Sequence, residues 1–113
     1  MMKFAIPLAD GKLAMHFGHC EEFALVEVDD DTKEIVETER VTPPAHAPGV
    51  LPKFLAEQGA SVIIAGGMGT RAQDMFAHND IKVVVGAPAE SPEKLVQDLL
   101  DEDLDLGDNV CDH

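Results

Sequence analysis

Tryptophan and tyrosine are absent from this chain of 113 residues, and basic residues are few. Eight lysines and arginines stand against 22 aspartates and glutamates, which gives a formal net charge of −14. Nucleic-acid binding depends on Lys and Arg side chains that meet phosphates, so this balance argues against nucleic acid and against anionic membrane surfaces as partners. It is compatible with a basic protein partner.

Cysteine and long apolar runs are also scarce. Cys20 and Cys111 are too few for a disulfide scaffold. No segment approaches the roughly 20 apolar residues that span a bilayer, and Pro7 breaks the short apolar run at the start, which makes a poor secretory signal. We therefore expect a cytoplasmic protein with free thiols.

Apolar residues make up 45% of the chain, which is enough for one globular domain with a core of its own. We expect this α/β domain to cover residues 1–100. Residues 101–113 form an acidic stretch with little periodicity, and we expect a flexible C-terminal tail there.

Hydrophobic periodicity predicts the element order β-β-β-α-β-α-β-α. The first three strands form an antiparallel meander, and the later elements are joined by right-handed crossovers. A mixed five-stranded sheet with helices on its faces follows from this order. The expected strands are Lys3–Leu8, Glu22–Val28, Glu34–Val41, Ser61–Ala65 and Ile81–Val85, and the expected helices are Val50–Gln58 and those beginning near Thr70 and Pro92.

Local signals mark the helix ends. Gly59 is placed to terminate the first helix. Thr70 and Gln73 have the spacing of a capping box at the start of the second helix. Ser91 followed by Pro92 predicts the start of the third.

Soft-metal ligands gather in the first loop, in the motif His16-Phe17-Gly18-His19-Cys20. Imidazole and thiolate suit transition metals and metal–sulfur clusters better than magnesium or calcium. The spacing is neither CxxC nor HExxH, so the motif alone does not separate a metal site from a surface loop around a core Phe.

Two further loops contain candidate binding residues. His46 lies in TPPAHAPG, where prolines order the backbone and can present an imidazole at little entropic cost. A glycine-rich turn follows the buried run SVIIA and precedes a helix, so its backbone N–H groups can form an anion cradle. The residues assigned to this cradle are Gly66, Gly67, Met68, Gly69, Thr70 and Arg71.

The positions of these loops suggest one site. Ligands in open α/β sheets collect at the carboxyl ends of the strands. If the first and fourth strands are neighbours, the HFGHC loop faces the glycine loop across one rim. Soft ligands beside an anion cradle fit a polyanionic metal–sulfur cluster better than a bare cation.

Four segments make the chain similar to a known family. MKFAIPLAD, MHFGHCEEFALVEVDDDT, PPAHAPGVLPKFLAEQGASVIIAGGMGTRAQDMF and IKVVVGA resemble the dinitrogenase iron–molybdenum cofactor-binding domain family, and within it the small single-domain members of the orange protein type. The resemblance covers about residues 2–100. The ordered set HFG, HAPG and GGxG carries it, since each motif alone is less specific.

The resemblance implies an RNase-H-like three-layer fold. It also implies reversible, non-catalytic binding or carriage of an anionic molybdenum-containing metal–sulfur cluster, of the molybdenum–copper sulfide or iron–molybdenum type. The family's HFG histidine maps onto His16, and its glycine loop maps onto Gly66–Gly69. His19, Cys20 and Cys111 do not map onto a family feature, which leaves open one ligand, several ligands or electrostatic contact alone.

We expect metal ligands among His16, Cys20 and His46, with Lys12, Lys53 or Arg71 meeting the negative charge of the cluster. Cofactor-assembly or acceptor proteins are the implied partners.

Two alternatives remain. Cys20 could act as an enzyme nucleophile with His16 or His19 as base, although no third group that would orient the base is evident. The chain could also be a cofactor-free regulatory or docking module that makes contact through its acidic tail.

Overall fold

The computed structural model describes residues 2–14, 22–42 and 50–101. Six strands and three helices occur in this part of the chain. The strands are β1 (Met2–Ala9), β2 (Lys12–Leu13), β3 (Glu22–Val28), β4 (Ile35–Val41), β5 (Val62–Ile64) and β6 (Lys82–Val84), and the helices are α1 (Val50–Glu57), α2 (Thr70–His78) and α3 (Pro92–Leu100).

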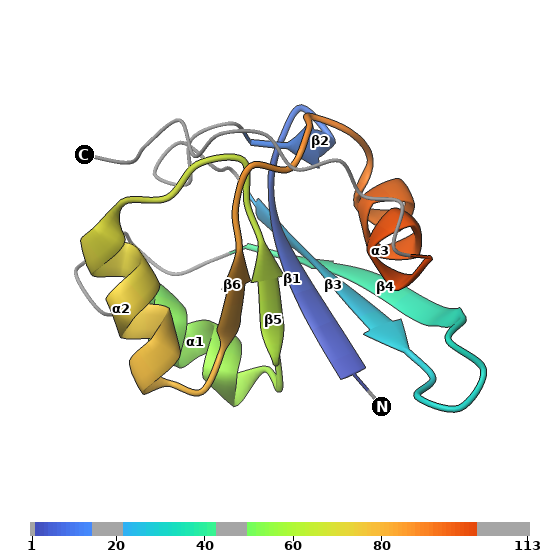
Figure 1. Ribbon diagram of the computed structural model, residues 1–113, viewed down its shortest axis with the longest axis horizontal. Helices are drawn as coiled ribbons and strands as arrows, with labels where there is room; N and C mark the ends of the chain where they lie inside the picture. Colours follow the sequence, from blue (N-terminus) through green and yellow to red (C-terminus); the bar gives the residue numbers. More distant parts are fainter. Residues whose placement is uncertain (1, 15–21, 43–49, 102–113) are drawn as a thin grey trace.

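One mixed sheet holds all the strands (Figure 1). Its main path is β4-β3-β1-β5-β6; β3 is antiparallel to both β4 and β1, whereas β1, β5 and β6 run parallel. The predicted five strands and their directions are therefore confirmed. The first and fourth predicted strands, β1 and β5, are neighbours.

The prediction of five strands was wrong in one respect, because β2 adds a sixth. It lies in the segment predicted as a loop after β1. Asp10 and Gly11 have φ of 54° and 80°, as a two-residue type I′ hairpin requires. The chain turns back there, so that Ala9 pairs with Lys12 and Leu8 pairs with Leu13.

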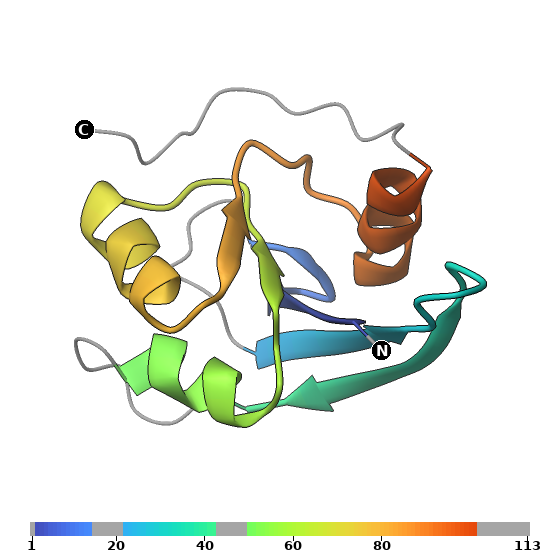
Figure 2. The same cartoon turned by 60° about the horizontal axis from the view of Figure 1, so that its bottom comes forward.

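Helices cover both faces of the sheet, as predicted (Figure 2). Side chains alternate between the faces along each strand. Ala5, Phe23 and Ile63 pack in one core cluster with Leu55 of α1 and Phe76 of α2.

The other face forms a second core cluster. Phe4, Ile6, Val26 and Ile64 pack there with Leu95 of α3. These three layers match the RNase-H-like arrangement implied by the sequence.

The helix ends agree with the sequence at two of three positions. Gly59, with φ of 88°, terminates α1: its N–H donates to the Ala56 carbonyl, and the next N–H donates to the Leu55 carbonyl. Ser91 and Pro92 are the N-cap and first residue of α3.

The capping box predicted for α2 was wrong. Gly69 occupies the N-cap position with extended backbone, and Thr70 is already helical. No side chain caps this end of α2.

Helices long and apolar enough to cross a membrane do not occur among the described residues.

Candidate functional site

Four strands end at one edge of the sheet, which lies at the top of Figure 1. β4 runs parallel to β1 because each is antiparallel to β3. β5 and β6 run parallel to β1 as well, so the connections that leave all four strands begin at this edge, here called the carboxyl edge. Ligands of open α/β sheets collect at such an edge.

Described residues anchor the ends of the two histidine-bearing segments at the carboxyl edge. The Ala14 N–H donates to the Pro7 carbonyl at 2.8 Å, and Glu22 pairs with Leu8 at the end of β1. Thr42 follows the last residue of β4. The predicted site residues of these two segments lie outside the described residues: His16, Phe17, Gly18, His19, Cys20 and His46.

The glycine loop, Gly66–Gly69, joins β5 to α2 at the carboxyl edge and is largely buried. Gly66, Gly67 and Met68 are buried, and Gly69 is half-buried. The β2 strand lies at the same edge and bonds to the β6–α3 connection, where the Leu13 N–H donates to the Glu90 carbonyl at 3.0 Å. β1 pairs with β5 through Phe4 and Ala5, and with β2 farther along the same side, which places β2 beyond the point where β5 ends.

Hydrogen bonds from the β6–α3 connection fix the first half of the loop. The Gly86 N–H donates to the Gly66 carbonyl at 3.0 Å, and the Ala87 N–H donates to the Ala65 carbonyl at 3.2 Å. Both carbonyls therefore point toward the β6 side.

Gln73 of α2 fixes the second half of the loop. Its side-chain Nε2 donates to the Met68 carbonyl at 2.9 Å, and its backbone N–H donates to the Gly69 carbonyl at 3.1 Å. The spacing of Thr70 and Gln73 predicted a capping box instead, so this role of Gln73 was missed. The signal was present as a glutamine four residues after the last loop glycine.

These four carbonyl bonds determine where the loop amides point. The described chain has no cis peptide bond, and in a trans peptide the N–H points opposite to the C=O. The N–H groups of Gly66 and Gly67 therefore face away from β6, and those of Gly69 and Thr70 face away from the body of α2. No hydrogen bond within the described residues uses the amides of Gly67, Gly69 or Thr70.

The amides of Gly67, Gly69 and Thr70, together called the amide array, can bind an anion. Backbone N–H groups in turns of this kind are donors for bound anions. The array also lies at the first turn of α2, where the helix macrodipole carries partial positive charge.

Three exposed cations lie on elements that reach the carboxyl edge. Arg71 is in the first turn of α2, Lys12 is in β2, and Lys53 is in the first half of α1. None of the three forms an ion pair with another described residue, whereas Arg40 pairs with Glu22 at 3.2 Å. Within the described ranges, no acidic side chain neutralises these three cations.

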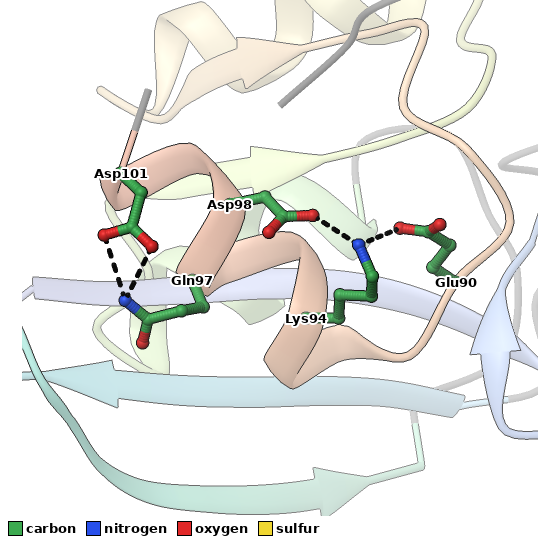
Figure 3. A network of polar contacts seen from close by, with 5 residues as sticks. All are labelled: Glu90, Lys94, Gln97, Asp98 and Asp101. Atoms are coloured by element: carbon green, nitrogen blue, oxygen red, sulfur yellow. Dashed lines mark hydrogen bonds and ion pairs between the residues drawn. The ribbon is translucent and has the colours of Figure 1, made fainter. Parts of the chain in front are cut away.

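Two described side chains have clearly shifted pKa values, and hydrogen bonds at the protein surface cause both shifts. Hydrogen bonds to Asp98 and then Glu90 raise the pKa of Lys94 on α3 (Figure 3). Backbone N–H groups of Asp31 and Thr32 lower the pKa of Asp29 in the β3–β4 turn. Neither shift belongs to the amide array, and no group of three or more His, Cys, Asp or Glu able to hold a metal occurs within the described ranges.

Known proteins share this architecture. The protein PH0822, whose crystal structure is known, is 27% identical and superposes with a TM-score of 0.84 over 94% of this chain and 96% of its own. The apo form of the orange protein from Desulfovibrio gigas is 25% identical, with a TM-score of 0.70 over 96% of this chain and 95% of its own.

A relative also matches in sequence. An uncharacterized protein of Methanocaldococcus jannaschii is 32% identical over 87 residues, which cover 74% of this chain and 73% of the relative. Residues 1–102 match the family described as dinitrogenase iron-molybdenum cofactor. The chain therefore belongs to the dinitrogenase iron–molybdenum cofactor family.

Proposed function

We propose that this protein binds and carries an anionic metal–sulfur cluster at the carboxyl edge of its sheet, without catalytic turnover. The amide array is the single observation that carries the proposal. Hydrogen bonds to the carbonyls of the same peptide groups fix the direction of its N–H groups, and nothing in the described chain accepts from them. Preorganised donors of this kind suit a ligand rich in sulfido or oxo acceptors.

The family and the solved orange protein support the choice of a metal-containing cofactor as the ligand. The cluster proposed is molybdenum-containing, of the molybdenum–copper sulfide or iron–molybdenum type. Arg71, Lys12 and Lys53 would offset its charge. His16 would be the first metal ligand, with Cys20 and His46 as further ligands.

Carriage implies a donor or an acceptor. We propose cofactor-assembly or acceptor proteins as the macromolecular partners, in keeping with the family.

The first experiment uses the absence of tryptophan and tyrosine, which leaves almost no protein absorbance in the near ultraviolet. Apoprotein titrated anaerobically with tetrathiomolybdate and Cu(I) should develop saturable visible bands that stay with the protein on gel filtration. Elemental analysis of the isolated complex should then find a fixed ratio of metal to protein. A titration with no saturable band and no retained metal would refute the proposed function.

A double variant tests the site assignment. His16→Ala with Arg71→Ala removes one imidazole and one guanidinium and should weaken binding roughly 10- to 100-fold, the range expected for losing charge-assisted contacts. The control is His78→Ala with Lys82→Ala, which removes one imidazole and one positive charge from exposed positions at the far end of α2 and the start of β6. Equal affinity of the two double variants would show that the site assignment is wrong.

A further inference from the structure

We infer that Gln73 is a positioning residue for the ligand site, because its side chain holds the peptide group between Met68 and Gly69 so that the Gly69 N–H faces the ligand. This inference rests on the proposed function. Gln73 does not meet the ligand in this arrangement. It acts through the Met68 carbonyl, to which its Nε2 donates at 2.9 Å.

The peptide group between Met68 and Gly69 needs such a restraint. Rotating it by half a turn would change φ of Gly69, and glycine accepts positive φ as readily as negative φ. A Cβ built on Gly69 meets nothing within 4 Å, so a side chain at this position would find open space. The Nε2 bond from Gln73 holds the Met68 carbonyl in the observed orientation, in which Gly69 has φ of −66°.

The rest of the loop has other restraints. The bonds from Gly86 and Ala87 hold only the first half, and the Gly69 carbonyl is held by the first backbone bond of α2. Thr70 makes no side-chain capping bond. Gln73 is half-buried on α2.

Loss of the donor should therefore loosen one amide of the array. Gln73→Met keeps the length of the side chain and removes its N–H donor. Affinity for tetrathiomolybdate with Cu(I) should fall about 5- to 10-fold, the effect of one net hydrogen bond. The matched control is Gln97→Met on α3, whose side-chain amide donates to Asp101 at 3.2 Å, away from the glycine loop (Figure 3).

A rescue variant separates positioning from general destabilisation. Alanine at position 69 disfavours positive φ, and φ of −66° is comfortable for it. The Gln73→Met substitution should therefore lower the affinity less in a protein that already carries Gly69→Ala than in the wild-type protein. This smaller loss is the rescue. Equal affinity of wild type and Gln73→Met would overturn the inference, and so would the absence of any rescue.

Relaxation of ¹⁵N in the apoprotein gives a readout that needs no cluster. Gln73→Met should lower the order parameters of Gly69 and Thr70 below the rigid value of about 0.85, while Gln97→Met should not. If wild type bound no cluster, the proposed function would fail, and this measurement would still decide whether Gln73 restrains the loop. Unchanged order parameters would overturn the inference; thermal unfolding of each variant checks that it is folded.

Discussion

At the scale of single residues, two helix ends depend on left-handed backbone. Gly59 ends α1 with φ of 88°, and Asp80 ends α2 with φ of 60°. The bonding after α2 repeats that after α1: the Asp80 N–H donates to the Ala77 carbonyl and the Ile81 N–H to the Phe76 carbonyl. Glycine suits this position best because it has no Cβ.

Replacing the glycine at position 59 should destabilise the fold, whereas introducing a glycine at position 80 should stabilise it. Gly59→Ala should lower the free energy of unfolding by about 1–2 kcal/mol, since alanine is strained at positive φ. Asp80→Gly should raise it by about 0.5 kcal/mol, because glycine relieves that strain at the cost of a more flexible unfolded chain. Chemical denaturation measures both. Asp74→Gly, within α2, is the control and should be destabilising; a destabilising Asp80→Gly would contradict the prediction.

A second residue-scale prediction concerns Asp29. Its Oδ1 accepts N–H bonds from Asp31 at 2.8 Å and Thr32 at 3.2 Å, and these bonds hold its pKa below the ordinary value. A carboxyl group with a lowered pKa stabilises the fold fully above its ordinary pKa of about 3.9, and this contribution is lost as pH falls through the folded-state pKa.

Asp29→Ala should therefore lower the melting temperature at pH 7. Asp31→Ala is the control, since it removes the same charge from the same turn and keeps both N–H donors. The gap in melting temperature between the two variants should narrow as pH falls below about 4. A gap that stays constant down to pH 2 would show that the Asp29 carboxylate does not support the turn through these bonds.

At the scale of elements, hydrophobic periodicity predicted the longer strands and missed the shortest one. The predicted strand Glu22–Val28 coincides with β3, because a short continuous apolar run, Phe23 to Val26, ends just before a polar turn. β2 has only two residues, too few to show a period. Asp10-Gly11 was its only signal, and a type I′ pair predicts the hairpin that the structure contains.

The glycine loop shows the same limit at the candidate site. Its residues and its place between a buried strand and a helix could be predicted from the sequence. The direction of its amides could not, because it depends on bonds from Gly86 and Ala87, about 20 positions later, and on the side chain of Gln73. The order of the strands in the sheet could not be predicted from the sequence either, because the pairing of β1 with β5 joins residues almost 60 positions apart.

At the scale of the whole molecule, one group of acidic residues lies far from the proposed anion site. The acids of the β3–β4 turn, Asp29 to Asp31 and Glu34, lie at the opposite edge of the sheet from the glycine loop, since Val28 pairs with Met2 at the start of β1. β1 has eight residues, so roughly 25 Å of strand separates the two edges at ~3.3 Å per residue.

This separation makes the effect of salt testable. The Debye length is roughly 30 Å at 0.01 M salt and ~8 Å at 0.15 M, so the distant acids repel an anion at low salt and are screened at physiological salt. Affinity for thiomolybdate should therefore rise between these concentrations. Asp31→Asn with Glu34→Gln should raise affinity at 0.01 M and leave it unchanged at 0.15 M. Affinity that falls steadily as salt is added would mean that Arg71, Lys12 and Lys53 outweigh the distant acids at every ionic strength.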